Sequence, residues 1–158
     1  MREYSQKIAE NIKQFLEDDD WNYRMDEENG VISTGMKLKC KFQRADVSIR
    51  IGTDTFMVLF ILPVNAEESV RPKVLDFINR ANYGLIRGGF EMDIRDGEVR
   101  FRTSHYCGKN IDMIDSEIIG DAVYLNYSMV ERYGSELMAV MMGFMEPDEA
   151  IEKADNRE

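Results

Sequence analysis

The residues that could form a catalytic pair are the single histidine, His105, and one of two cysteines, Cys40 and Cys107. A thiol becomes a nucleophile when a neighbouring base takes its proton and a third group orients that base. His105 and Cys107 lie two residues apart, so a β-strand would turn both side chains to the same face. The sequence supplies no evident orienting group or oxyanion hole beside them, and residues at a strand end usually only pack. We therefore interpret both cysteines as reduced thiols and predict that the protein is not an enzyme.

Three consecutive carboxylates, Asp18 to Asp20, offer the oxygen ligands that calcium prefers. In a calcium loop beginning at Asp18, however, Tyr23 would occupy the sixth position, where glycine is needed, and Asn29 the twelfth, where a bidentate glutamate belongs. A single histidine cannot build a metal site of two imidazoles, and the cysteines lack C-x-x-C spacing. We predict no metal and no cofactor, and we interpret the acidic cluster as a solvated helix end.

Lys37, Lys39 and Lys41 alternate, which would place a basic stripe on one face of a strand. Such a stripe could bind an acidic peptide or a phosphate, but edge strands often carry lysine to prevent unwanted pairing, and this second interpretation is favoured. Glycines at 84, 88 and 89 follow a predicted helix and precede a strand. That order is the reverse of a phosphate-binding loop, which must open a helix, so we assign the glycines to turns.

Four methionines and a phenylalanine gather in MAVMMGFM, residues 138–145. On a helix, positions i, i+3, i+4 and i+7 form one continuous apolar stripe. Methionine fills irregular cores, but its flexible thioether also suits surfaces that bind partners. Core and partner surface are both open for different members of the group. We predict partner binding for Met138, Met141, Met142, Phe144 and Met145.

Composition limits the classes of protein to consider. The chain has 158 residues, 44% hydrophobic and 32% charged, which predicts one globular domain over residues 1–158. Its longest apolar run, Phe56 to Leu62, is too short to span a membrane, and the charged N-terminus lacks the features of a secretory signal, so we expect a cytoplasmic protein. The net charge of −10 disfavours nucleic acid and anionic lipid as partners.

The elements that would position these residues begin with an amphipathic helix before residue 20. Asn29-Gly30 predicts a type I′ hairpin turn, followed by a return strand over 31–42 that points Cys40 at the core. The segment TFMVLFIL, residues 55–62, is apolar on both faces, so a strand there needs a cover on each side. We expect helices on one side and a long loop, a second copy or a partner on the other.

The second half of the chain predicts a helix capped by Ser69, with Pro72 in its first turn. Asp96-Gly97 predicts a two-residue turn that places Glu91 opposite Arg102 and turns Ile94 into the core. A long helix over 116–142 is apolar around most of its circumference and should be buried on more than one side, and a short helix begins at Pro147. The predicted fold is α+β, an antiparallel five- to six-stranded sheet with N-terminal, central and long C-terminal helices.

The stretch from Leu62 to Arg102 resembles the central signature of the YbjN family. The similarity rests on Pro63 after the apolar strand, on Phe77-Ile78-Asn79, on Gly89-Phe90 and on Gly97-Glu98-Val99, and it extends to the tail segment VMMGFMEPDEAIEKA. The resemblance implies a small bacterial sensory transduction regulator with a fold like that of type III secretion chaperones. No catalytic residues come with it.

The function we predict is a non-enzymatic protein-interaction or regulatory module, a homodimer that binds a partner protein segment through apolar surface of the sheet or the long helix. An acidic rim would select basic partners. The alternative is a small-molecule sensor, in which the 90–102 hairpin and the long helix enclose a pocket, with polar contacts from Tyr106, Tyr124 or Tyr127.

Overall fold

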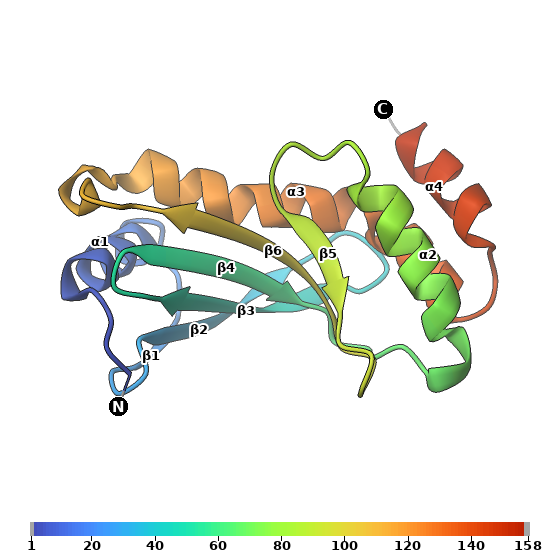
Figure 1. Ribbon diagram of the computed structural model, residues 1–158, viewed down its shortest axis with the longest axis horizontal. Helices are drawn as coiled ribbons and strands as arrows, with labels where there is room; N and C mark the ends of the chain where they lie inside the picture. Colours follow the sequence, from blue (N-terminus) through green and yellow to red (C-terminus); the bar gives the residue numbers. More distant parts are fainter. Residues whose placement is uncertain (1, 157–158) are drawn as a thin grey trace.

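A computed structural model describes residues 2–156 as one antiparallel sheet with helices on one side (Figure 1). The six strands lie in the order β1-β2-β3-β4-β6-β5. This confirms the predicted α+β class. The strands are β1 (Arg24–Asp26), β2 (Val31–Lys37), β3 (Arg44–Ile51), β4 (Thr55–Ile61), β5 (Gly89–Met92) and β6 (Val99–Tyr106). The helices are α1 (Gln6–Asp18), α2 (Arg71–Asn82), α3 (Ser116–Met141) and α4 (Pro147–Asp155), with 3₁₀ turns at Glu68–Val70 and Ile111–Met113.

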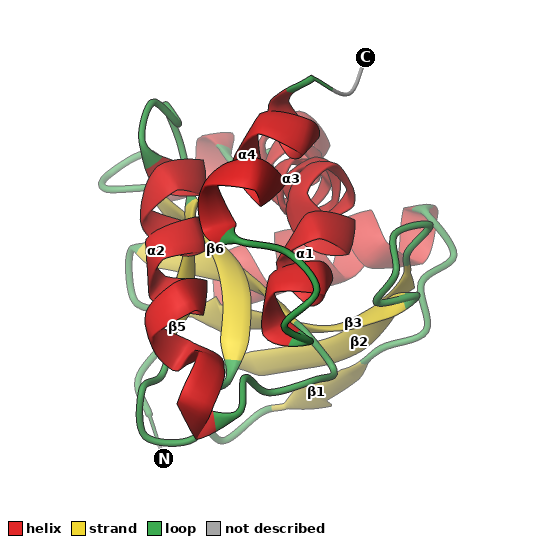
Figure 2. Cartoon of the chain, turned by 90° about the vertical axis from the view of Figure 1, so that its right-hand side faces the viewer, coloured by secondary structure: helices red, strands yellow, loops and turns green. Residues whose placement is uncertain are grey.

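The curved sheet wraps around α3, which crosses its inner face and packs on β4 and β6 (Figures 1 and 2). α1 packs on α3 at one end, whereas α2 and α4 pack on it at the other. The predicted burial of the long helix on more than one side is therefore confirmed. The outer face of the sheet, which we call the open face, carries no helix of the described chain.

Local sequence explains where the helices begin and end. The Ser5 hydroxyl accepts a hydrogen bond from the Ile8 amide at 3.2 Å and caps α1, and the Asp115 carboxylate caps α3 in the same way. α3 ends at Met141, and Gly143, two residues later, has a φ of +74° that allows the Phe144 amide to donate back to the carbonyl of Ala139 at 2.8 Å. α2 differs from prediction, because Val70, not Ser69, precedes it and no side chain caps it.

β4 is an apolar strand that is covered on both faces. Phe56, Val58 and Phe60 are buried under the helices. Leu59 points to the open face and yet is 0% exposed, although no other element of the described chain lies there. Its ladder neighbours are Ser48 and Arg102, so side chains of the adjacent strands, including the aliphatic stems of arginines, must supply the second cover.

The 38–43 segment is a loop, not the predicted continuation of the return strand, because β2 ends at Lys37. Cys40 is buried as expected, but through packing on α3, where a Cβ on Gly134 would lie 2.7 Å from its sulfur. The Glu131 carboxylate accepts from the Lys39 amide at 2.6 Å and holds the loop. The β1–β2 hairpin also lacks the type I′ turn, because Asn29 is not left-handed and the Asp26 side chain shapes a longer loop.

The β5–β6 hairpin is shifted by two residues from the predicted register. Glu91 lies opposite Arg100, not Arg102, because the Asp93 carboxylate accepts from the Arg95 amide at 2.9 Å and widens the turn. A shift of two keeps each side chain on its predicted face. Ile94, expected in the core, instead sits in the turn and is 63% exposed.

Candidate functional site

The structure does not arrange His105 and Cys107 for catalysis. The His105 ring stacks on Phe56 with 5.4 Å between ring centres, and Cys107 is buried just after β6. Burial, with the nearby Asp54 charge, raises the pKa of the Cys107 thiol to about 11, which is opposite to the activation that a nucleophile needs. No group of three or more His, Cys, Asp or Glu side chains suited to a metal ion occurs within residues 2–156.

The acidic cluster at the end of α1 has a structural role. The Asp19 carboxylate accepts hydrogen bonds from the Tyr124 hydroxyl at 2.7 Å and the Trp21 indole at 2.8 Å. These bonds, that of Tyr124 first, lower the pKa of Asp19. The carboxylate therefore ties α1 to α3, and Tyr124 is committed to this contact.

The five residues predicted to bind a partner do not form one stripe, because α3 ends at Met141. Met141 is buried, and Met138 and Met145 are partly buried against the core. Met142 and Phe144 lie on the surface, 47% and 84% exposed. Partner binding by this group stays a prediction, with Met142 and Phe144 as its accessible members.

A feature that the sequence did not reveal is the unpaired edge of β6. β5 pairs with β6 only as far as Gly89, opposite Arg102, whereas β6 continues to Tyr106. The β5–β6 register would place residues 87 and 85 opposite Ser104 and Tyr106. Gly88, with φ of +72°, turns the chain away before it reaches those positions. Half of β6 therefore has a neighbour on one side only.

Backbone groups of this edge point outward. On β5 the Phe90 amide and carbonyl bond the Asn82 side chain, each at 2.8 Å, so Gly89 and Glu91 face β6. Strand alternation then directs the N–H and C=O groups of Arg102, and equally of Ser104 and Tyr106, to the β5 side. For Ser104 and Tyr106 no strand of residues 2–156 is there to receive them.

A groove of about 310 Å³ runs beside this edge on the helix side, and we call it the edge groove. Arg87, in the loop before β5, forms an ion pair with Asp121 of α3 at one wall of the groove. Hydrogen bonds from Arg87 lower the pKa of Asp121. Ile86, in the loop beside the groove, is 97% exposed. None of Tyr106, Tyr124 and Tyr127 lines it. Its lining is Ile86, Arg87, Gly88, Thr103, Ser104, His105, Ile118, Asp121, Ala122 and Leu125.

A buried polar contact fixes the strand and helix that form the groove. The Asn126 amide donates to the Thr103 hydroxyl at 2.6 Å, and that hydroxyl donates to the Ala122 carbonyl at 3.1 Å. Asn126 is 0% exposed, so the contact is shielded from water. This contact therefore holds β6 and α3 together at the groove.

Together these features define the class: an α+β domain whose distinctive surface is an unpaired strand edge beside a groove lined by both polar and apolar side chains. The chain belongs to the YbjN family, since the family model described as "Putative bacterial sensory transduction regulator" matches residues 9–137.

A solved structure supports the fold. The crystal structure of YbjN, described as a putative transcription regulator from E. coli, superposes with a TM-score of 0.55 at 11% identity, covering 85% of this chain and 89% of that one. No curated protein matches the chain. No helix within residues 2–156 has the length and apolar character needed to cross a membrane.

Proposed function

We propose that the protein is a non-enzymatic regulatory module that binds an extended segment of a partner protein at the edge groove. The observation that carries the proposal is the pair of outward-facing backbone positions, Ser104 and Tyr106, beside a groove whose lining includes the apolar Ile118 and Leu125. An extended backbone is the ligand that matches alternating N–H and C=O groups. Side chains on one face of the added strand would enter the groove between Ile118 and Leu125.

The other sheet edges are protected, which favours a role for the unprotected one. Asn82 occupies the outer edge of β5 with its side-chain amide. At the opposite edge β1 is short and leaves residues 34–37 of β2 without a strand neighbour on that side, but this stretch ends in the exposed Lys37, a residue type that opposes strand pairing. The edge at Ser104 carries neither device.

The test is selection of peptides from a random displayed library against the wild type, followed by affinity measurement on two variants. Ser104→Pro removes the outward N–H and leaves the ladder to β4 intact, whereas Ser104→Ala removes only the hydroxyl. We expect Ser104→Pro to weaken the selected peptides about tenfold, since one backbone hydrogen bond and the strand fit are lost, and Ser104→Ala to change affinity less than about twofold.

Equal affinities for the two variants would contradict strand addition. The small-molecule alternative predicts that result, because a compound in the groove would not use the Ser104 amide. A groove of about 310 Å³ is at the lower end for such ligands. A thermal-shift screen that raised the melting temperature of wild type but not of Leu125→Arg would then favour the sensor function.

A further inference from the structure

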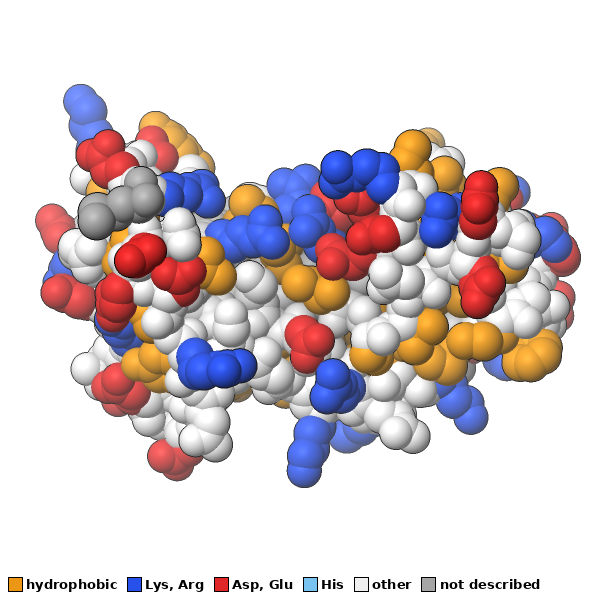
Figure 3. All heavy atoms as spheres, turned by 90° about the horizontal axis from the view of Figure 1, so that it is seen from below, with side chains coloured by type: hydrophobic (Ala, Val, Ile, Leu, Met, Phe, Trp, Pro, Cys, Tyr) orange, Lys and Arg blue, Asp and Glu red, His pale blue; other side chains and the backbone are white. Residues whose placement is uncertain are grey.

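The open face of the sheet is basic, although the whole chain has a net charge of −10. Strand register assigns to it six basic and three acidic side chains. Figure 3 shows Lys and Arg side chains spread along the middle of this face, with Asp and Glu side chains among them. The basic residues are Arg24, Lys37, Arg44, Arg50, Arg100 and Arg102, and the acidic ones are Asp26, Asp46 and Glu91.

The acidic side chains of this face already have partners. Glu91 accepts hydrogen bonds from Arg100 at 2.6 Å and from Arg102 at 3.2 Å. Asp46 lies 3.7 Å from Arg44, and the Asp26 carboxylate accepts bonds within its own turn. Three basic side chains are left over. Arg24, Lys37 and Arg50 make no ion pair within residues 2–156.

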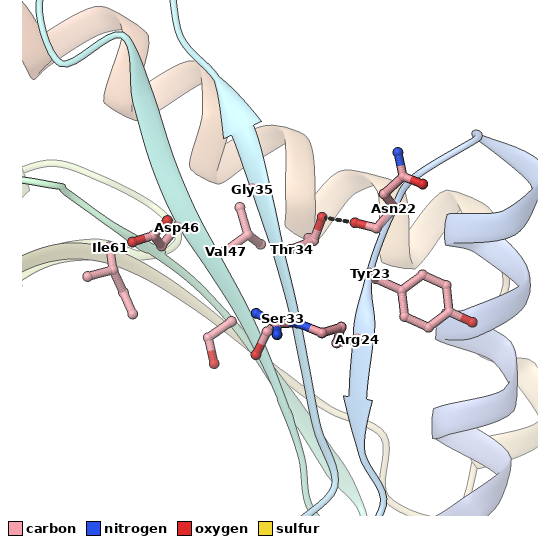
Figure 4. A pocket seen from close by; sticks show the side chains of 10 residues that line it. Asn22, Tyr23, Arg24, Ser33, Thr34, Gly35, Asp46, Val47 and Ile61 are labelled. Carbon is pink, nitrogen blue, oxygen red and sulfur yellow. Dashed lines mark hydrogen bonds between the residues drawn. The ribbon is translucent and has the colours of Figure 1, made fainter.

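One of these cations, Arg24, lines a trough of about 750 Å³ over β1, β2 and β3, and Asp46 lines it as well (Figure 4). Ser33, Ser48 and Gly35 keep its floor low, and the two serines add hydroxyl donors. The Arg24 side chain extends from β1 across β2 toward Ser33 (Figure 4). Arg50 belongs to the next row of the sheet, opposite Val31.

The positive groups also stand beside apolar surface. Met57 and Ile61 of β4 are partly exposed on the open face, on either side of the buried Leu59. A ligand that pairs with the arginines could bury this surface as well. Arg side chains recognise carboxylates with paired hydrogen bonds.

We infer that the open face binds an acidic segment of a partner polypeptide, whose carboxylates pair with Arg24, Arg50 and Lys37. An acidic partner is the opposite of the basic partner that the net charge of the whole chain predicts. Nucleic acid fits less well, because a duplex contacts many phosphates and the rest of this chain repels them. The surface differs from the edge groove, which faces α3, so the two sites can be tested separately.

The experiment measures binding of a short fluorescent peptide of alternating glutamate and serine, by anisotropy at about 50 mM and about 300 mM salt. Arg24→Gln with Arg50→Met removes two charges and keeps an aliphatic stem at position 50. Lys7→Gln with Lys41→Gln removes two exposed charges that also make no ion pair within residues 2–156 and do not lie on the open face, and serves as the matched control. We expect the open-face variant to bind about tenfold more weakly, the control to change less than about twofold, and high salt to abolish the difference.

Three results would overturn the inference: no binding of the acidic peptide by wild type at low salt, equal loss in both double variants, or tighter binding of an oligonucleotide of equal charge. Melting temperatures of both variants check that they are folded. Ser104→Pro should leave acidic-peptide binding unchanged, so failure at the open face and failure at the edge groove are distinguishable.

Discussion

At the residue scale, Cys107 shows how position decides the chemistry of a thiol. It lies two residues after the only histidine of the sequence, His105. Cys107 is nevertheless buried at the end of β6, whereas the His105 ring stacks on Phe56. Burial disfavours the thiolate, and the nearby Asp54 charge adds to that effect. Proximity in sequence to a histidine therefore does not lower the pKa of this thiol.

The raised pKa of Cys107 predicts a loss of stability in alkali. Its pKa rises from 9.0 to about 11 in the fold, so the folded state keeps a proton that the unfolded state releases. The associated stability is present below about pH 9 and is lost as the pH rises through the folded value. Urea unfolding across this range should show that loss, and Cys107→Ala should reduce the slope. An unchanged slope in the variant would contradict a buried neutral thiol.

Replacing Asn126 with aspartate tests how much a buried charge behind the groove would lower the free energy of unfolding. Asn126 is 0% exposed, and its carbonyl oxygen has no hydrogen-bond partner within the described chain. Asn126→Asp should lower the free energy of unfolding by about 3 kcal/mol at neutral pH, because a carboxylate would lose its hydration. Burial raises the pKa of such a carboxyl, so the loss should shrink as the pH falls toward 4. Asn79→Asp on the exposed side of α2 is the control, and equal losses in both variants would refute the explanation.

At the element scale, the sheet edges are treated differently. Asn82, the last residue of α2, bonds both the amide and the carbonyl of Phe90, which closes the outer edge of β5. β6 has no such closure at Ser104. The same sheet thus contains one edge closed by a side chain and one left available.

Asn82→Ala tests this closure. We expect it to lower the free energy of unfolding by about 1–2 kcal/mol, because two partly buried backbone groups lose their partners. Amide hydrogen exchange of Phe90 should accelerate. Asn79→Ala, an exposed helix position near the same end of α2, should have little effect, and an Asn82 variant as stable as this control would contradict the assigned role.

The sequence predicts elements better than their pairing. Helices α1, α3 and α4 follow from apolar periodicity and caps, which are local. The β5–β6 register was missed because a shift of two preserves the inside and outside faces, so alternation cannot distinguish the two pairings. Leu38, Cys40 and Phe42 alternate like a strand, yet they lie in a loop because α3 offers them a surface to pack on.

The candidate site was harder to predict. An unpaired edge depends on two strands having different lengths, and only the glycines at 88 and 89 hint at where the chain leaves β6. The predicted methionine stripe continues past Met141, where α3 ends. The spacing of the apolar side chains stays helical beyond that point, but the backbone turns at Gly143. Both features depend on tertiary packing.

At the scale of the whole molecule, the charge balance of the open face differs from that of the chain. A chain with ten surplus negative charges places six basic and three acidic strand residues on this face, and Arg24, Lys37 and Arg50 among them make no ion pair within residues 2–156. The edge groove lies on the helix side of β6. The two proposed sites therefore lie on different sides of the sheet and can be tested independently.

The predicted homodimer is tested by light scattering. Phe144, 84% exposed, and Met142 form the accessible apolar surface at the end of α3. If this surface joins two copies, wild type should be a dimer and Phe144→Asp a monomer, because a charge in an apolar interface is costly. Ser104→Pro should remain dimeric. A monomeric wild type at high concentration would contradict the homodimer.

The most direct test of the central claim is amide hydrogen exchange with and without a selected peptide. In the free protein we predict fast exchange at Ser104 and Tyr106, since their amides have no strand partner, and slow exchange at Thr103 and His105, which face β4. Peptide binding should slow exchange at Ser104 and Tyr106. If the two amides are already protected in the free monomer, or if protection on binding appears elsewhere and not at β6, partner binding by strand addition is wrong.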